Sequence, residues 1–206
     1  MNIPKLHCIT YDHAPYTHFE QVEFVIKSGL KWVQVRIKNR SESTSNEILE
    51  ITKLCKEHQV TCIINDYYEF VIPLKANGIH CGLKDQHPIV LYNLLGKNRI
   101  IGTTVNSPED AKKVAEYQKS HYVGVGPYKA TSTKENLANI LTADDHQEIL
   151  NTLTIPAIAI GGIQPEDVKE ILNLGYHGIA VSSGIFCANN PMQSINNYLT
   201  AIESHV

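Results

Sequence analysis

The sequence predicts an α/β protein folded as a single (β/α)8 barrel of the TIM type over residues 1–206, and three observations support this. Short runs rich in β-branched residues recur at fairly even spacing along the chain. The segments between these runs show helical periodicity. Polar residues follow several runs at the point where a strand would end. Because the carboxyl ends of all barrel strands meet at one rim, this fold would bring those polar residues together.

The expected strands are four or five residues long and share a content of Val, Ile and Thr. They are Leu6–Thr10, Trp32–Arg36, Thr61–Asn65, Gly78–Cys81, Ile100–Thr104, Tyr122–Val125, Pro156–Ile160 and Gly178–Val181. Between them, residues such as Ile48 and Ile51 show helical spacing, and Thr142 before Asp144-Asp145-His146 predicts a capped helix start. An open doubly wound sheet would show the same alternation. The count of eight runs favours the barrel, and no dinucleotide-binding or Walker A glycine loop follows the first run.

The composition narrows the classes of function. With 206 residues, 43% of them hydrophobic, and a formal charge of -3, we expect one domain and no nucleic-acid partner. Five scattered cysteines without a C-x-x-C pair indicate neither a disulfide framework nor a zinc ribbon. The first residues lack the apolar stretch of a signal peptide, and the longest apolar run is too short to span a bilayer. We therefore expect a cytoplasmic protein that has no membrane partner.

Two cations and an amide lie on the second expected strand and just after it. Gln34, Arg36 and Lys38 share one parity, and the apolar residues between them share the other, so the polar set should face the barrel lumen and rim. A guanidinium that binds two phosphate oxygens, together with a mobile ammonium, suits a polyanion. A salt-bridge cluster at the strand end is the alternative, and these residues alone leave both interpretations open.

Carboxylates follow the third and fourth expected strands. Asp66 and Asp85, completed by substrate oxygens and water, would form the hard oxygen environment that Mg²⁺ prefers. Taken separately, Asp66 is also typical of a helix N-cap and Asp85 of a turn. Their position beside Arg36 and Lys38 favours a site for magnesium and a diphosphate. His80 has inward parity, and we expect it to be a core or orienting group.

Glycines and hydroxyls follow the last two expected strands. The Gly161-Gly162 and Ser182-Ser183 turns lie where barrels commonly bind phosphate, because glycine lets an anion approach the backbone. The stretch Pro127–Thr142 is longer than a typical loop of about 2–6 residues between strand and helix. It carries the sequence Thr131-Ser132-Thr133-Lys134, which reads either as a phosphate-contacting loop or as an ordinary polar loop.

Together, these segments resemble the thiamine phosphate synthase family along nearly the whole chain. The matching pieces are Gln34-Val35-Arg36-Ile37-Lys38, Ile64-Asn65-Asp66, Gly78-Ile79-His80-Cys81-Gly82 with Asp85, Gly126-Pro127, Thr131-Ser132-Thr133-Lys134, Ala159-Ile160-Gly161-Gly162-Ile163 and Ala180-Val181-Ser182-Ser183. Each piece is short, but their order and spacing together are specific. Enzymes of this family are (β/α)8-barrel transferases of thiamine biosynthesis. They join hydroxymethylpyrimidine diphosphate to hydroxyethylthiazole phosphate and release diphosphate, with Mg²⁺ as the metal.

The resemblance implies a role for each matching residue. Pyrimidine diphosphate would be held by Gln34, Arg36, Lys38, Asn65 and Lys134, of which Arg36, Lys38 and Lys134 would supply the catalytic cations. Magnesium would be held by Asp66 and Asp85. Thiazole phosphate would be held by Thr131, Thr133, Gly162, Ser182 and Ser183, and Thr104 keeps a hydroxyl where the family usually has serine. The partners expected are these phosphorylated precursors, and the sequence leaves open whether the chain forms a homo-oligomer.

Other functions on this barrel remain alternatives. The related thiazole tautomerases rely on a histidine in the loop after the fifth strand, where this chain has Asn106, which cannot shuttle a proton at neutral pH. A non-catalytic paralogue that binds a thiamine precursor is kept open by departures from the family's usual residues at Lys84 and Asn139–Thr142. A sugar-phosphate isomerase or epimerase would need an acid–base pair at the rim, and the sequence offers no clear one.

Overall fold

Parallel strands close into a barrel in the computed structural model, which describes residues 2–83, 85–130 and 139–205. The strands are β1 Leu6–Ile9, β2 Trp32–Val35, β3 Thr61–Asn65, β4 Gly78–Gly82, β5 Ile100–Val105, β6 Tyr122–Val125, β7 Ala157–Ile160 and β8 Gly178–Val181. Each strand pairs with its neighbours in sequence, and β8 pairs with β1. Within the described residues, the (β/α)8 barrel predicted from the sequence is therefore confirmed.

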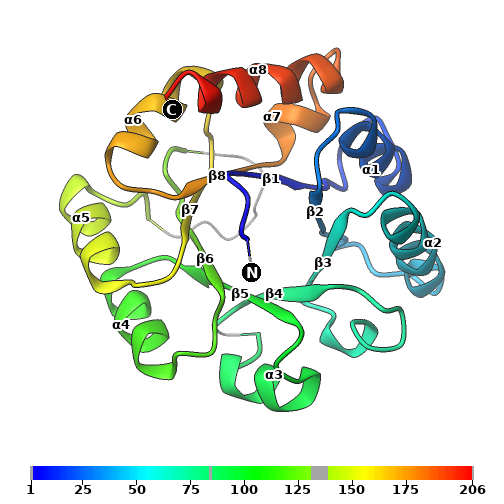
Figure 1. Ribbon diagram of the computed structural model, residues 1–206, viewed down its shortest axis with the longest axis horizontal. Helices are drawn as coiled ribbons and strands as arrows, with labels where there is room; N and C mark the ends of the chain where they lie inside the picture. Colours follow the sequence, from blue (N-terminus) through cyan, green and yellow to red (C-terminus); the bar gives the residue numbers. More distant parts are fainter. Residues whose placement is uncertain (1, 84, 131–138, 206) are drawn as a thin grey trace.

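Helices form an outer ring around the strands (Figure 1). They are α1 His18–Lys27, α2 Thr44–Glu57, α3 Pro88–Leu95, α4 Pro108–Tyr117, α5 Ala143–Thr152, α6 Val168–Asn173, α7 Ser183–Phe186 and α8 Pro191–Glu203, with 3-10 turns η1 Tyr68–Phe70 and η2 Pro165–Asp167. The predicted start of α5 is confirmed, because the Thr142 hydroxyl accepts from the Asp145 N–H and the Asp145 carboxylate accepts from the Thr142 N–H. This reciprocal capping satisfies two backbone donors at the start of the helix.

One connection differs from the expected alternation of strand and helix. After β3 the described chain forms only the short turn η1 before β4. Asp66 and Lys75, near the two ends of this connection, both have positive φ, at 64° and 60°. Backbone in this left-handed conformation does not continue a right-handed helix. Pro73 also lacks the N–H that a helix interior needs, so the segment stays a compact loop.

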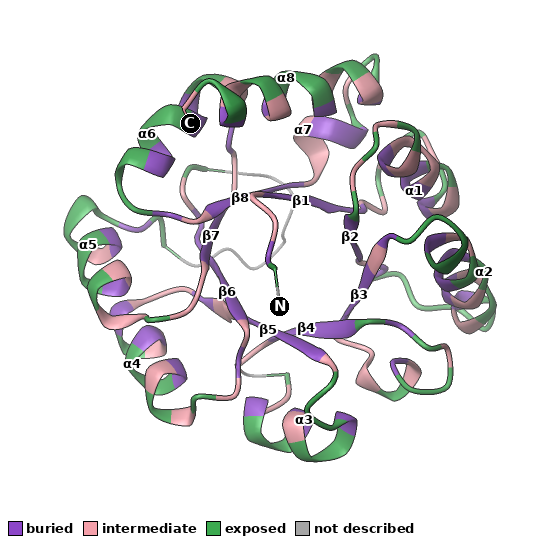
Figure 2. Cartoon of the chain, viewed as in Figure 1, coloured by how far each residue is buried: buried purple, intermediate pink, exposed green. Residues whose placement is uncertain are grey.

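Two hydrophobic layers make up the core, one inside the barrel and one between the strands and the helices. Figure 2 shows that buried residues concentrate along the strands. The inner layer includes Ile3, Trp32, Tyr122 and Ile158, each at most 5% exposed. Because side chains alternate across a strand, the opposite set packs under the helices and forms the outer layer. Truncating a fully buried residue such as Ile158 to alanine should cost about 2–5 kcal/mol of stability.

The N-terminal segment closes the amino-terminal end of the barrel, in the middle of the view in Figure 1. The backbone carbonyls of Ile3 and Pro4 accept hydrogen bonds from His177 Nε2 at 2.6 Å and from His7 Nε2 at 3.1 Å. The Lys5 carbonyl accepts from Ile179 N–H at 2.7 Å. These bonds hold the N-terminal segment against the amino-terminal end of the barrel.

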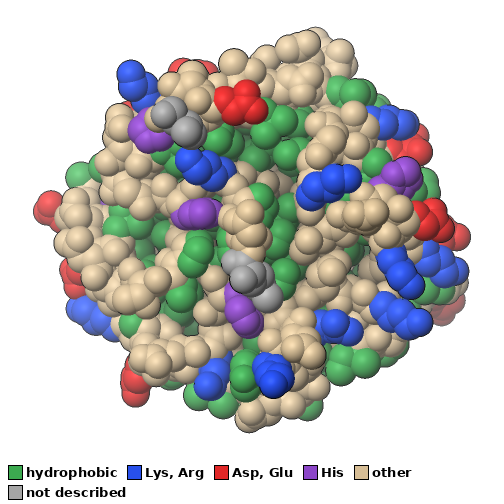
Figure 3. Space-filling view, in the orientation of Figure 1, with side chains coloured by type: hydrophobic (Ala, Val, Ile, Leu, Met, Phe, Trp, Pro, Cys, Tyr) green, Lys and Arg blue, Asp and Glu red, His purple; other side chains and the backbone are tan. Residues whose placement is uncertain are grey.

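The outer surface carries charge of both signs. On the face shown in Figure 3, Lys and Arg side chains are dispersed around the molecule and interspersed with Asp and Glu. Among the helices of the described residues, none combines the length and the apolar character needed to cross a membrane.

Candidate functional site

A cavity of about 140 Å³ opens at the carboxyl ends of the strands. Its lining includes seven of the residues predicted from the sequence: Gln34, Arg36, Asn65, Thr104, Gly162, Ser182 and Ser183. Lys38, Asp66 and Asp85 follow β2, β3 and β4 and are not part of this lining. Thr131, Thr133 and Lys134 lie outside the described residues. The fold therefore gathers polar groups from strands far apart in sequence at one end of the barrel.

The floor of the cavity is a chain of hydrogen-bonded polar groups on β4, β5 and β6. His80 is 9% exposed and contacts the Tyr122 hydroxyl through Nδ1 and the Thr104 hydroxyl through Nε2, both at 3.0 Å. Gly102 makes room for this contact, because a Cβ there would collide with both the Tyr122 ring and His80. Burial raises the pKa of Tyr122, so its phenol stays protonated. His80 therefore faces inward, as its parity predicted, and it is buried and hydrogen-bonded.

The cations that follow β2 are held in two different ways. Gln34 is 3% exposed in the lumen, and Arg36 lines the cavity. Within the described residues, the Arg36 guanidinium makes no ion pair and is available to an anion. Lys38 Nζ instead pairs with Asp66 Oδ2 between side chains that are 48% and 20% exposed. An ion pair this exposed is worth at most about 1 kcal/mol, so an anion or a metal could displace it readily.

The two carboxylates lie in turns on either side of Cys81. Asp66 has φ 64°, and its N–H donates to the His80 carbonyl at 2.9 Å. Asp85 Oδ2 accepts from the Gly82 N–H at 3.0 Å, as the turn interpretation predicts. Burial raises the pKa of the Cys81 thiol to about 12, and the Asp66 and Asp85 carboxylates add to the shift. Both negative charges therefore act on the same small region between β3 and β4.

No group of three or more His, Cys, Asp or Glu side chains in the described part of the chain is placed to hold a metal ion. A pair of carboxylates is compatible with Mg²⁺ only if other oxygens complete the coordination. That is the usual arrangement for this ion, which keeps several waters and takes further ligands from substrate phosphate.

The loops after β7 and β8 border the cavity on the other side of β1. Gly161 and Gly162 have φ 105° and 65°, and the backbone of the loop after β6 lies against them. In this loop the Lys129 N–H donates to the Gly161 carbonyl at 3.0 Å. Within the described residues, the Ser182 hydroxyl is buried and has no hydrogen-bond partner. A buried hydroxyl that lines a cavity and lacks a partner is well suited to a ligand oxygen.

Several cavity residues were not assigned a role from the sequence. His7, Asn106, Tyr122 and Gln164 also line the cavity. Burial lowers the pKa of His7 to about 3, and the neighbouring His80 adds to this, so the ring is neutral. Asn106 donates its side-chain amide to the Gly126 carbonyl, which ties it to the backbone. The parity shared by Tyr122, Gly124 and Gly126 could have indicated that Tyr122 faces inward.

Comparisons with known proteins agree on one family. The family model described as Thiamine monophosphate synthase matches residues 6–185. A thiamine-phosphate synthase of Bacteroides thetaiotaomicron is 36% identical over 91% of this chain and 92% of its own length. Another, from Flavobacterium psychrophilum, is 36% identical over 93% of this chain and 95% of its own length. The solved thiamine phosphate pyrophosphorylase from Pyrococcus furiosus superposes with a TM-score of 0.84 at 26% identity, covering 98% and 96% of the two chains.

Proposed function

Because this chain belongs to the thiamine monophosphate synthase family, we propose that it is a thiamine-phosphate synthase, a transferase that joins two phosphorylated precursors. In this reaction the bond between the pyrimidine methylene carbon and the diphosphate oxygen breaks, and diphosphate leaves with the bonding electrons. The lone pair of the thiazole nitrogen then forms a bond to the methylene carbon. The products are thiamine phosphate and diphosphate.

The observation that carries this proposal is the presence of two candidate anion sites on either side of β1, around one cavity. One consists of Arg36 and Lys38 after β2, and the other of the Gly162 and Ser182 turns after β7 and β8. Two separate phosphorylated substrates would need two such sites. Holding both substrates over one cavity converts a bimolecular reaction into an effectively unimolecular one, which is a large part of the rate that positioning can supply.

The residues around β2 and β3 are assigned to the pyrimidine diphosphate. Arg36 would bind phosphate oxygens in a fork, and Lys38 would add a mobile charge. Gln34 and Asn65, which are 3% and 8% exposed, present amides that can donate to and accept from a heteroaromatic ring. The Thr104 hydroxyl is assigned to the same substrate. Electrostatic stabilisation of the departing diphosphate would then supply much of the remaining rate.

Asp66 and Asp85 fit a magnesium ion, because they supply a pair of hard oxygen ligands beside the proposed diphosphate site. When bound, Mg²⁺ would neutralise negative charge that develops on the diphosphate. Asp66 is already paired with the ammonium of Lys38, so its carboxylate accommodates a positive partner in the same place. The thiazole phosphate is assigned to Gly162, Ser182 and Ser183 and, outside the described residues, to Thr131 and Thr133. Lys134, which also lies outside the described residues, is assigned to the pyrimidine diphosphate.

The site offers little to the proton-transfer chemistry of a thiazole tautomerase. Asn106 stands where that chemistry would need a histidine, and its amide is bonded to the Gly126 carbonyl. His80 and His7 are buried, and the pKa of His7 is far below neutrality. A phosphate-displacement reaction, in which positioning and charge do most of the work, suits this site better.

The test is to incubate the purified protein with both phosphorylated precursors and Mg²⁺, and to measure thiamine phosphate and diphosphate. We expect the two products in equal amounts, and none when either precursor is left out or the metal is chelated. Lys38→Met should lose most of this activity, whereas Lys112→Met should keep it. Lys112 is a matched control because its ammonium is similarly exposed and also pairs with a carboxylate, Glu148 at 2.7 Å, on the helical ring. Wild-type protein that forms neither product would refute the proposed function.

A further inference from the structure

Thr10 and Asp12, just after β1, hold the backbone segment that carries Arg36 and Lys38, and His18 bonds to both of them. This segment, residues 36–38, continues beyond the last residue of β2, Val35, and so lies outside the regular strand. Arg36 N–H donates to the Thr10 hydroxyl at 2.9 Å. Lys38 N–H donates to both carboxylate oxygens of Asp12, at 3.2 and 3.1 Å. Side chains from the neighbouring loop therefore replace the ladder bonds that a strand would have made.

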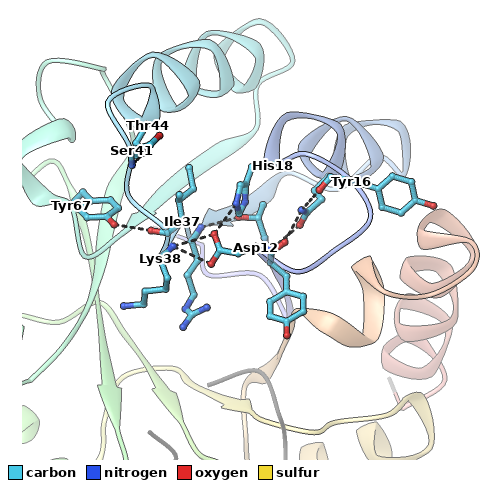
Figure 4. Close-up of polar contacts among 12 residues, drawn as sticks. Asp12, Tyr16, His18, Ile37, Lys38, Ser41, Thr44 and Tyr67 are labelled. Atoms are coloured by element: carbon cyan, nitrogen blue, oxygen red, sulfur yellow. Dashed lines mark hydrogen bonds and ion pairs between the residues drawn. The ribbon is translucent and has the colours of Figure 1, made fainter. Parts of the chain in front are cut away.

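His18 joins the two acceptors into one network. Its Nδ1 contacts the Thr10 hydroxyl at 2.8 Å, and its Nε2 contacts Asp12 Oδ1 at 3.1 Å. Figure 4 shows the dashed lines that converge on Asp12 from His18 and Lys38. All the contacts are satisfied when His18 donates from Nε2 to Asp12 and accepts the Thr10 hydroxyl proton at Nδ1. Thr10 can then accept from Arg36 N–H without leaving any donor unused.

The side chains of the network are largely buried, although the backbone of Lys38 and the cations that it supports are not. Thr10 is 0% exposed, and the side chains of Asp12 and His18 are 9% and 10% exposed. Hydrogen bonds in such surroundings are strong and costly to leave unmade, so they hold the backbone in a single position. The local structure of α1 supports this arrangement, because His18 is the first residue of the helix and a capping box at Thr17 fixes where the helix begins.

The Ile37 carbonyl, the third backbone group of residues 36–38, is held from the side opposite Thr10 and Asp12. The Tyr67 hydroxyl donates to the Ile37 carbonyl at 2.8 Å, from the loop after β3 (Figure 4). Arg36 N–H, Ile37 C=O and Lys38 N–H are thus each fixed by a side chain from a neighbouring loop.

We propose that Thr10, Asp12 and His18 are positioning residues for the reaction, which fix the backbone of residues 36–38 so that Arg36 and Lys38 meet the diphosphate of the first substrate. This inference rests on the proposed function. None of the three needs to touch a substrate, because they act on main-chain atoms. Loosening the segment should therefore weaken diphosphate binding and departure while leaving the thiazole phosphate side of the cavity unchanged. A misplacement of about 1 Å can cost on the order of a hundredfold in rate.

The test compares two buried threonines. Thr10→Val removes the acceptor for Arg36 N–H without changing the shape of the side chain, and Thr10→Ser restores it. Thr103→Val is the matched control, because Thr103 is 1% exposed and its hydroxyl bonds to Ser120 at 2.6 Å, away from residues 36–38. We expect Thr10→Val to lower kcat/KM for the pyrimidine diphosphate by about ten- to a hundredfold. It should leave the KM for the thiazole phosphate within about twofold of the parent value, and Thr10→Ser should recover most of the loss.

Two further measurements complete the test. Tyr67→Phe removes only one hydroxyl from a half-buried ring and should lower the same kcat/KM in the same direction, even if Thr10→Val does not fold. Calorimetric titration with inorganic diphosphate and Mg²⁺ should show weaker binding to Thr10→Val than to Thr103→Val. This titration does not require turnover, so it still tests positioning if the wild type lacks synthase activity. The proposal is overturned if Thr10→Val and Tyr67→Phe behave like Thr103→Val, or if both substrates are affected equally.

Discussion

Substitutions at Asp66 should separate stability from activity, because this residue combines a left-handed backbone with the proposed metal ligand. Its φ of 64° costs a residue with a Cβ about 1–2 kcal/mol, less for Asp or Asn, and nothing comparable for glycine. Its ion pair with Lys38 is exposed and contributes at most about 1 kcal/mol. The free energy of unfolding of Asp66→Gly should therefore be within about 1 kcal/mol of the parent value, and that of Asp66→Asn should be close to the parent value too. Asp66→Ala should be destabilised by about 1–2 kcal/mol.

Activity should follow a different order. All three variants lose the carboxylate, so each should lose at least about tenfold in turnover at limiting Mg²⁺, the scale seen when groups around a bound metal are removed. Urea titrations give the free energies of unfolding, and product formation across a range of Mg²⁺ concentrations gives the metal requirement. If the activities instead rank with the stabilities, with Asp66→Gly near the parent, Asp66 acts through loop conformation and the magnesium assignment is wrong.

Three other residues give sharp expectations. Arg36→Lys keeps the charge but loses the two-pronged contact, so kcat/KM for the pyrimidine diphosphate should fall by about tenfold or more, and unchanged kinetics would argue against phosphate binding. Gly162→Ala should lower the free energy of unfolding by about 1–3 kcal/mol more than Gly29→Ala. Both have positive φ, but only a Cβ at 162 would lie 2.6 Å from the Ala130 carbonyl, and equal losses would contradict this. Burial lowers the pKa of His7 from 6.5 to about 3, so stability is lost as the pH falls from 6.5 toward 3, where only the unfolded chain takes up a proton. His7→Asn should reduce the steepness of that loss, by up to about 1.4 kcal/mol per pH unit, in urea titrations at pH 6.5 and 4.5.

The strands could be predicted because each is a short buried run whose composition and length leave few alternatives. The bounds of Thr61–Asn65, Tyr122–Val125 and Gly178–Val181 are those of the prediction, and each of the other strands differs at one end by one residue. The seventh strand begins at Ala157 and not at Pro156, which has no N–H to donate. The connection after β3 was harder to predict, because residues with positive φ other than glycine leave only a weak signal in a single sequence.

The cavity residues that could be predicted are those whose inward direction follows from the alternation of side chains along a strand. Parity placed Gln34 and Arg36 toward the lumen, and both line the cavity. The contacts of Asp12 and His18 could not be anticipated in the same way, because they join loops that lie beside each other only after the barrel has closed. In the sequence, Asp12 is typical of a turn, and nothing local indicates that its carboxylate accepts from the Lys38 backbone.

The division between floor and rim suggests why the proposed reaction is arranged as it is. Charged groups taken out of water carry a desolvation penalty that neutral hydrogen-bonding groups largely avoid. The buried floor accordingly holds the hydrogen-bonded His80 and Tyr122, whereas Lys38 and Asp66 remain partly exposed at the rim. A pyrimidine ring bound over the floor would direct its diphosphate toward the rim, where Lys38 and Asp66 lie. The leaving group would then separate toward solvent, while the carbon that it leaves stays over the buried floor.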